Sequence, residues 1–347
     1  MCGIVGYVGD RDCADVLVDA LSKLEYRGYD SAGIAVFEKG TIKVEKCKGR
    51  LANLVDKMAV DGKPQGHCGI GHTRWATHGE PSDINSHPHG NKRVSIVHNG
   101  IIENYKQIKD FLVEEGYSFV SETDTETVAK LLDYYYVDDP VDTIIKVLSE
   151  IKGSYALGIM FRDYPDTVFA VRKESPLIVG VGENENFLAS DVPAIIKYTR
   201  DYYLLEANEI AVVKKDSVQI YDMHKEPVHK EINTADWDVD AAEKGGYEHF
   251  MLKEIHEQPA AVRDTVSPRI INGMPDLSQD GVDMQKLKDY RQIFIVACGT
   301  AMHAGMVGKY VIEKLARKPV IVDIASEFRY RDPVIDGQDV VIAISQS

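Results

Sequence analysis

Cysteine is scarce in this 347-residue sequence, and its spacing excludes two kinds of stabilising framework. The five cysteines are Cys2, Cys13, Cys47, Cys68 and Cys298, an odd number with no CxxC or CxxxC pair. Disulfide scaffolds and structural zinc sites both rely on paired, closely spaced cysteines. We therefore expect neither a disulfide framework nor a bound metal.

Long apolar runs and an excess of basic residues are missing as well. No run approaches the roughly 18 to 20 apolar residues that span a bilayer, and the N-terminus lacks a basic segment followed by an apolar one. The 55 Asp and Glu outnumber the 40 Lys and Arg, which gives a formal net charge of −15. Because nucleic-acid binding needs a basic face, the sequence predicts no nucleic-acid partner. The missing apolar run predicts no membrane span, and we expect a reduced, cytoplasmic location.

The second residue is the first candidate for chemistry. Removal of Met1 would make Cys2 the N-terminal residue, so that a thiol and a free α-amine would share one residue. The amine has a reference pKa of about 7.7 to 8.0 and the thiol one of about 8.5, so the amine can accept the thiol proton directly or through one water. Nucleophiles activated by their own N-terminal amine are known. A cysteine at position 2 can also be incidental.

The first part of the chain, to about Asp222, is rich in short β-type runs interrupted by three or four helices. Helices are expected at Asp12–Glu25, after the capping-box pattern Thr123–Glu126, and at Asp142–Lys152 with Gly153 as the C′ glycine. This order predicts a layered α+β fold. The expected strands are 2–9, Ala32–Phe37, Ser95–His98, Ser154–Phe161, Thr167–Val171, Leu177–Val181, Ile210–Val213 and Val218–Tyr221.

A polar stretch after Asp222 indicates a connector, and a different pattern begins at Gln292. Continuous apolar strands alternating with a helix predict the start of a parallel α/β domain. Because an open α/β sheet needs more strands, we expect the chain to stop in mid-domain at Ser347. The expected elements are strands Ile293–Cys298, Val320–Ile324 and Val340–Ile344, and the helix Thr300–Ala316.

Two short strings supply groups that could assist a nucleophile. In HTRWATHG, residues 72–79, Arg74 has the planar fork that grips a carboxylate. In HNG, residues 98–100, a side-chain amide and a backbone N–H could stabilise an oxyanion. Other interpretations stay open at this point: Asn99-Gly100 as a hairpin turn, Arg74 as a surface charge and Asp124 as a helix cap.

The chain resembles the glutamine:fructose-6-phosphate aminotransferases (isomerizing), also called glucosamine-6-phosphate synthases. The resemblance covers essentially the whole chain and rests on CGIVGYVG, LEYRGYDSAGIA, GHTRWATHGEPS, HNGIIENY, SETDTE, ACGT and IASEFRYR. It implies an N-terminal-nucleophile hydrolase αββα sandwich, followed by sugar isomerase (SIS) domains. The domains expected are 1–222 for the class II glutamine amidotransferase, 223–284 for a connector with the first helices of the isomerase part, and 285–347 for an incomplete first SIS domain.

The resemblance also implies roles for individual residues. Cys2 would attack the glutamine amide, its amine would be the base, and Asn99 with Gly100 would form the oxyanion hole. Arg74 would bind the α-carboxylate of glutamine and Asp124 its α-ammonium. Thr77, His78 and Gly79 would line the pocket. Trp75 resembles the family's ammonia gate, although a tryptophan packed in a core is the alternative interpretation.

A partial sugar-phosphate site is implied in the second part of the chain. It would consist of Gly299, Thr300, Ser345, Gln346 and Ser347, with Ala301 where the family usually has a serine hydroxyl. The substrates implied are L-glutamine and fructose 6-phosphate, without a cofactor, and the full-length family implies a homodimer.

Three interpretations of the function follow from these observations. The first is amino-sugar synthesis from fructose 6-phosphate and glutamine, with this chain limited to glutamine hydrolysis. The second is a class II amidotransferase for another acceptor, and the third is a decayed sugar-phosphate-binding fragment.

Overall fold

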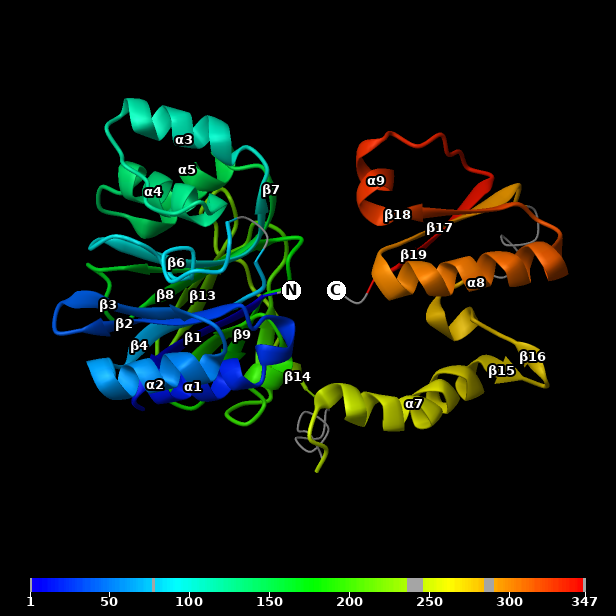
Figure 1. Cartoon of the computed structure of the whole chain (residues 1–347), viewed down its shortest axis with the longest axis horizontal. Helices are drawn as coiled ribbons and strands as arrows, with labels where there is room; N and C mark the ends of the chain where they lie inside the picture. Colours follow the sequence, from blue (N-terminus) through cyan, green and yellow to red (C-terminus); the bar gives the residue numbers. More distant parts are fainter. Residues whose placement is uncertain (1, 77–78, 236–245, 284–289, 346–347) are drawn as a thin grey trace. The chain divides into compact units, whose positions relative to one another are not determined.

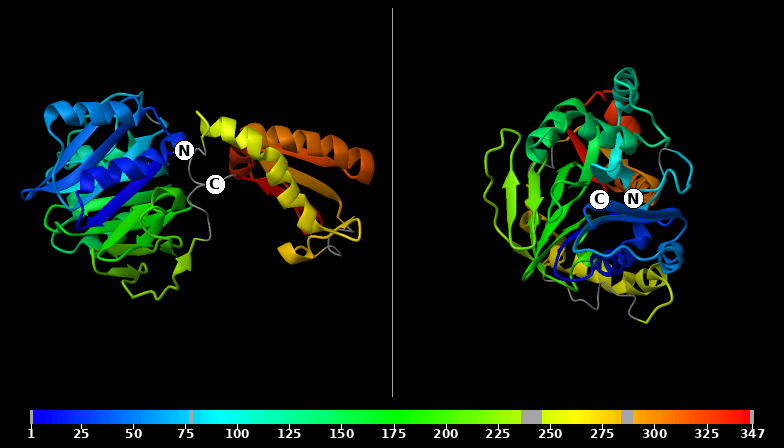
Figure 2. Two further views of the ribbon diagram at one scale, coloured as in Figure 1. Left: turned by 90° about the horizontal axis from the view of Figure 1, so that it is seen from below. Right: turned by 90° about the vertical axis from the view of Figure 1, so that its left-hand side faces the viewer.

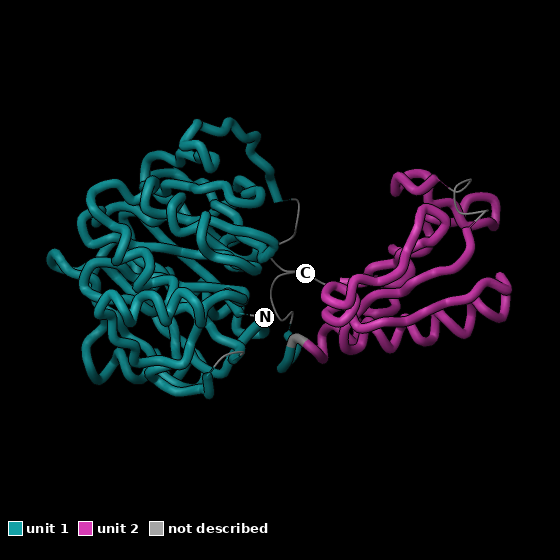
Figure 3. The backbone as a smooth tube through the Cα atoms, turned by 90° about the horizontal axis from the view of Figure 1, so that it is seen from above, with its two compact units in different colours: residues 1–250 teal, residues 251–347 magenta. Residues whose placement is uncertain are grey.

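The structure is a computed structural model that describes residues 2–76, 79–235, 246–283 and 290–345. The chain divides into two compact units, Met1–Phe250 and Met251–Ser347, drawn in teal and magenta in Figure 3. The domain boundaries expected at residues 222 and 284 stay predictions.

The first unit contains two antiparallel sheets. The larger sheet has the order β14 (Asn233–Thr234), β11 (Asp201–Leu204), β9 (Ile178–Val181), β10 (Glu185–Ala189), β1 (Gly3–Gly9), β4 (Cys68–Arg74), β2 (Ser31–Glu38) and β3 (Thr41–Lys48). The smaller sheet has the order β13 (Val218–Tyr221), β12 (Ile210–Val213), β8 (Val168–Lys173), β7 (Gly153–Phe161), β6 (Val94–Ile102) and β5 (His89–Gly90).

Helices cover the outer face of each sheet, so the first unit has four layers (Figure 1). The right-hand view of Figure 2 shows the same order of layers from another side. The helices against the larger sheet are α1 (Cys13–Ser22) and α2 (Leu51–Asp61); those against the smaller sheet are α3 (Tyr105–Glu114), α4 (Asp124–Tyr135) and α5 (Pro140–Glu150).

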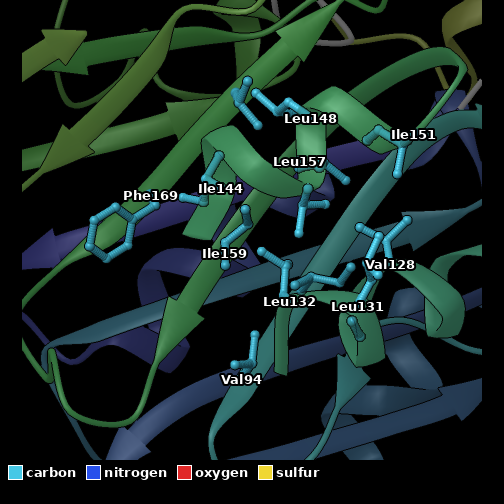
Figure 4. Close-up of a cluster of buried hydrophobic side chains, with 14 of the residues drawn as sticks. Val94, Val128, Leu131, Leu132, Ile144, Leu148, Ile151, Leu157, Ile159 and Phe169 are labelled. Carbon is cyan, nitrogen blue, oxygen red and sulfur yellow. The ribbon is translucent and has the colours of Figure 1, made fainter. Parts of the chain in front are cut away.

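Three clusters of buried apolar side chains hold these layers together. One lies between the larger sheet and α1 and α2, and one between the smaller sheet and α3, α4 and α5, as Figure 4 shows for Leu132, Ile144 and Ile159. The third joins the two sheets and includes Ile70 of β4 and Val97 of β6. The expected αββα sandwich is confirmed, since each apolar sheet face is buried against another layer.

Local hydrogen bonds explain where the helices begin and end. Only half of the predicted capping box forms at α4: the Thr123 hydroxyl accepts the N–H of Glu126 at 3.3 Å. The Glu126 carboxylate accepts the N–H of Ser121 at 2.6 Å, and the N–H of Thr123 donates to the Ser121 hydroxyl instead. The prediction for Gly153 is wrong. Helix α5 ends at Glu150 because Ile151 turns to an extended conformation, and Gly153 is the first residue of β7.

The second unit contains a parallel sheet with the strand order β18 (Val320–Ile324), β17 (Gln292–Ala297) and β19 (Asp339–Ile344). Ile293, Ile295 and Val320 form its buried centre, and α8 packs on β17 and β18. The predicted parallel α/β pattern is confirmed. The helices and strands from residue 250 onward are α7 (Phe250–Val266), β15 (Ile270–Ile271), β16 (Met274–Pro275), β17 (Gln292–Ala297), α8 (Gly299–Ala316), β18 (Val320–Ile324), α9 (Ala325–Tyr330) and β19 (Asp339–Ile344).

Short 3₁₀ turns complete the described chain. They are η1 (Glu25–Arg27), η2 (Val192–Ala194), η3 (Ser267–Arg269) and η4 (Ser278–Asp280). Within the described ranges, no helix combines the length and apolarity that crossing a bilayer requires.

Candidate active site

Cys2 lies directly before β1, beside the end of β4, whose last residue is Arg74 and which Trp75 follows. The register pairs Gly3 with Thr73, which brings Cys2 beside the residues that follow. The main-chain N–H of Trp75 donates to the Cys2 Sγ at 3.1 Å, and the Sγ lies 3.4 Å from the Trp75 carbonyl oxygen. Burial raises the pKa of the Cys2 thiol, although the Trp75 N–H opposes that shift. The resting group is therefore a thiol that needs a base.

Asn99 and Gly100 lie inside strand β6 and do not form a hairpin turn. They pair with Ala156 and Tyr155 of β7. The Asn99 Nδ2 donates to the Cys2 carbonyl oxygen at 3.0 Å, so the carboxamide lies next to the candidate nucleophile. Gly100 has φ +131°, and a Cβ added there would lie 2.1 Å from the Ser154 carbonyl oxygen. Only glycine fits this position without moving the backbone.

Arg74 and Asp124 are both buried, with 3% and 4% of their surfaces exposed. The Arg74 Nη2 donates to the Gly79 carbonyl oxygen at 3.1 Å, so Arg74 is not a surface charge. Asp124 is the first residue of α4, and Thr123 is the cap. The Asp124 Oδ2 accepts the N–H of Ile102 at 2.8 Å, which ties the helix start to the end of β6.

One cavity of about 280 Å³ joins these groups. It lies near the lower end of the volumes typical of ligand pockets, which favours a ligand the size of an amino acid. Gly79 does not line the cavity, but its carbonyl oxygen accepts a hydrogen bond from Arg74, which does. Thr77 and His78 lie outside the described residues. The cavity is lined by Cys2, Arg27, Arg74, Trp75, His87, His98, Asn99, Gly100, Ile101, Thr123, Asp124, Thr125, Ser154, Ser175 and Pro176.

Trp75 is not a core residue, because 47% of its surface is exposed. Its ring meets Tyr29 edge to face, with centroids 5.8 Å apart. The segment around Tyr29 also supports the backbone near Trp75. A Cβ on Gly28 would lie 2.6 Å from the Arg74 carbonyl carbon, and the Asp30 Oδ2 accepts the N–H of Ala76 at 2.9 Å. Asp30 was not predicted from the sequence. It lies in the string RGYDSAG, which could have pointed to it.

Four buried histidines were also missed: His72, His87, His89 and His98. Of these, the His72 Nε2 lies 3.1 Å from the Asn99 Oδ1. Burial lowers the pKa of His72 to about 3 and holds those of His87 and His89 well below their usual value. These three rings are therefore neutral near pH 7. In the part of the chain that the structure describes, no group of three or more His, Cys, Asp or Glu residues is arranged to hold a metal ion.

In the second unit, the predicted phosphate-binding residues that the structure describes lie at the carboxyl edge of the parallel sheet. Gly299 and Thr300 begin α8 after β17, and Ser345 follows β19. Ala297 pairs with Ile344, so the ends of these two neighbouring strands meet. Ligands of open α/β sheets bind at such edges. Ala301 follows within α8, while Gln346 and Ser347 lie outside the described residues.

Comparison with known proteins assigns both parts of the chain. Residues 72–197 match the glutamine amidotransferase domain family, and residues 286–347 match the SIS domain family. The chain is 57% identical to glutamine–fructose-6-phosphate aminotransferase (isomerizing) of Caldanaerobacter subterraneus subsp. tengcongensis, over 100% of this chain and 57% of that protein. The proteins of the same name from Clostridium tetani and Aquifex aeolicus are 56% and 49% identical over the whole chain, and over 57% and 58% of their own lengths.

Two solved structures share the fold. One, described as the allosteric regulatory enzyme of purine biosynthesis, has a TM-score of 0.57 at 24% identity and covers 64% of this chain and 49% of that one. The other, the glutamine phosphoribosylpyrophosphate amidotransferase of B. subtilis complexed with ADP and GMP, has a TM-score of 0.59 at 19% identity and covers 92% and 65%.

The chain spans a little over half the length of the curated relatives it matches. It has the N-terminal-nucleophile amidotransferase fold followed by SIS sequence, in one continuous match to those relatives. The chain is therefore a relative of the glutamine–fructose-6-phosphate aminotransferases (isomerizing), and its residues 72–197 match the glutamine amidotransferase domain family.

Proposed function

We propose that the first unit hydrolyses the side-chain amide of L-glutamine, with Cys2 as the nucleophile after removal of Met1. The observation that carries this proposal is that Cys2, Arg74, Asn99, Gly100 and Asp124 all line one cavity. These residues come from separate segments of the chain, and a purely structural role would not require them to face a common space.

In the proposed first step, the α-amine of Cys2 takes the thiol proton, because burial raises the thiol pKa and disfavours spontaneous ionisation. The sulfur then bonds to the glutamine Cδ. The electron pair of the C=O bond moves to oxygen and gives a tetrahedral oxyanion. The Asn99 carboxamide and the Gly100 N–H are the proposed donors to that oxygen, and losing one such donor commonly costs about 3 kcal/mol of barrier height.

Collapse of the oxyanion breaks the C–N bond, while the protonated amine returns its proton to the leaving nitrogen. Ammonia departs, and a γ-glutamyl thioester remains on Cys2. Water activated by the same amine then attacks the thioester, which releases glutamate and restores the thiol.

Recognition of glutamine is assigned to the two buried charges. We propose that the Arg74 guanidinium binds the α-carboxylate and that the Asp124 carboxylate binds the α-ammonium. Both groups are held in place by protein hydrogen bonds, Arg74 by the Gly79 carbonyl oxygen and Asp124 by the Ile102 N–H. Thr77, His78 and Gly79 are proposed to complete the pocket, and Trp75 to gate the passage of ammonia.

For the whole protein, we propose transfer of the ammonia to fructose 6-phosphate to give glucosamine 6-phosphate. The names of the relatives and the SIS match support this acceptor over another one. A decayed fragment is less well supported, because the proposed glutaminase residues Cys2, Arg74, Asn99, Gly100 and Asp124 line one cavity. Synthesis of amino sugars, a cytoplasmic location, a homodimer and sugar-phosphate binding at Gly299, Thr300, Ser345, Gln346 and Ser347 stay predictions.

Steady-state glutaminase assays test the proposal. The unaltered chain should release glutamate from glutamine, and Cys2→Ala should abolish this activity. Cys298→Ser is the matched control, because Cys298 is exposed and lies in the second unit. Glutaminase activity that survives in Cys2→Ala would contradict the proposal.

A further inference from the structure

We propose that His72 is a positioning residue that orients the Asn99 carboxamide, so that its N–H groups face Cys2 and the bound glutamine. The inference rests on the proposed function and deepens it, because it assigns a fixed support to the oxyanion donor. His72 itself does not line the cavity.

The hydrogen bonds define which ring nitrogen of His72 carries the proton. The His72 Nε2 lies 3.0 Å from the His98 carbonyl oxygen and 3.1 Å from the Asn99 Oδ1. A carbonyl oxygen can only accept, so the Nε2 must be the donor. The group of Asn99 that faces this donor must then be its oxygen. The Asn99 Nδ2 consequently points the other way, where it donates to the Cys2 carbonyl oxygen at 3.0 Å.

This chain of bonds connects the two sheets. Cys2 leads into β1 of the larger sheet, and Asn99 belongs to β6 of the smaller sheet. His72 lies on β4, next to β1, and its ring reaches across to β6. The apolar residues between the sheets fix their separation but do not select which end of an amide faces the nucleophile. The polar bond from His72 makes that selection.

The surroundings hold the His72 ring in one plane. His72 has no exposed surface, and its ring stacks on His87 with centroids 4.1 Å apart and an interplanar angle of 14°. The His87 Nδ1 accepts the N–H of His98 at 3.3 Å, so His87 is itself attached to β6. Lys46 Nζ donates to the Ser86 carbonyl oxygen at 2.7 Å and secures the segment that carries His87.

The His72 Nδ1 is buried and has no hydrogen-bond partner among the residues that the structure describes. Protonation of that nitrogen would place an unpaired donor in the interior, which is unfavourable. The neutral tautomer with hydrogen on Nε2 is therefore the one that the site accommodates.

The kinetic test compares His72→Leu, which removes the donor, with His72→Gln, whose side-chain N–H can occupy the position of Nε2. His72→Leu should lower kcat for glutamine hydrolysis on the order of 100-fold, because a misplaced donor weakens transition-state stabilisation. KM for glutamine should change by less than about 3-fold, since Arg74 and Asp124 are untouched. His72→Gln should recover about 10-fold or more of the lost kcat.

A double mutant separates positioning from a general effect on folding. In an Asn99→Ala background, His72→Leu should cause little further loss, because its effect passes through the Asn99 amide. His89→Gln is the matched control: His89 is also buried, but its Nε2 contacts the Thr123 hydroxyl at 3.1 Å and not Asn99. Near-ultraviolet circular dichroism confirms that each variant is folded. The inference would be overturned if the kcat losses of the two single variants multiply in the double mutant. An unchanged kcat in folded His72→Leu would also overturn it.

Nitrogen-15 NMR of the histidine-labelled chain tests the placement independently of activity. The expected result is a resting His72 with hydrogen on Nε2 and a lone pair on Nδ1. The opposite tautomer would overturn the inference even if glutaminase activity is normal. Conversely, the expected tautomer in a chain that does not hydrolyse glutamine would contradict only the proposed function.

Discussion

The main-chain N–H of Trp75 donates to the Sγ of Cys2 across 3.1 Å. This contact follows from the β1–β4 register and attaches the candidate nucleophile to the residue proposed as the ammonia gate. The side chain of Trp75 is half exposed, and its ring contacts Tyr29, whereas its main-chain N–H bonds to Cys2. Movement of the Trp75 segment would therefore also change the hydrogen bonding of Cys2.

Asp124→Asn should impair recognition of the α-ammonium without disturbing the fold. The asparagine Oδ1 can still accept the N–H of Ile102, so only the charge is lost. We expect KM for glutamine to rise on the order of 10-fold or more, as a charged hydrogen bond contributes about 1.5 to 3 kcal/mol. The measurement compares glutamine with 4-carbamoylbutyrate, which lacks the amino group. An unchanged preference for glutamine in the variant would contradict the assigned role of Asp124.

Gly100→Ala should destabilise the first unit because the new Cβ would lie 2.1 Å from the Ser154 carbonyl oxygen at φ +131°. We expect a loss of about 3 kcal/mol in the free energy of unfolding, from a backbone clash added to strain. Gly116→Ala is the control: it has φ +92° but nothing within 4 Å of its Cβ, so strain of about 1 kcal/mol alone applies. Equal losses of unfolding free energy in urea titrations of the two variants would show that the contact with the Ser154 carbonyl oxygen of β7 does not cause the destabilisation.

Stability should fall with acidification below about pH 6.5, the reference pKa of an unfolded histidine. Burial lowers the pKa of His72 to about 3 and holds those of His87 and His89 well below normal, so the unfolded chain binds more protons between these limits. The stability that the neutral rings contribute is present above pH 6.5. It is lost as the pH falls, by up to about 1.4 kcal/mol per pH unit for each histidine.

Urea titrations at pH 7.5, 6.5 and 5.5 measure this dependence. His89→Gln should reduce the slope, whereas His224→Gln should not, because His224 is exposed. A slope that is the same in His89→Gln and in the unaltered chain would contradict the explanation.

Much of the fold follows from local patterns in the sequence. The strands Ile210–Val213, Val218–Tyr221 and Val320–Ile324 agree with the predicted ranges, since each is a short β-branched run between turn residues. Gly153 was misassigned because a glycine after a helix suits both a C′ position and the start of a strand. Helix α7 lies within residues 223–284, where a connector with the first helices of the isomerase part was expected, but its bounds could not be predicted because Pro259 and the charged residues obscure the helical period.

The site was predictable only where the residues themselves carry the chemistry. Cys2, Arg74, Asn99 and Asp124 could be named from their strings, and the structure brings them to one cavity. The partners that hold them could not be named. Contacts such as His72 with Asn99 and Asp30 with Ala76 depend on how strands pair, and a buried histidine has the same sequence signature whether it supports an amide or fills a core.

The most direct test of the account is the intact mass of the purified chain before and after treatment with 6-diazo-5-oxo-norleucine, an electrophilic glutamine analogue. The account predicts a mass without Met1 that gains one adduct, and no adduct in Cys2→Ala. A chain that retains Met1 and gains no adduct, or an adduct that persists in Cys2→Ala, would contradict Cys2 as an N-terminal nucleophile in a glutamine pocket.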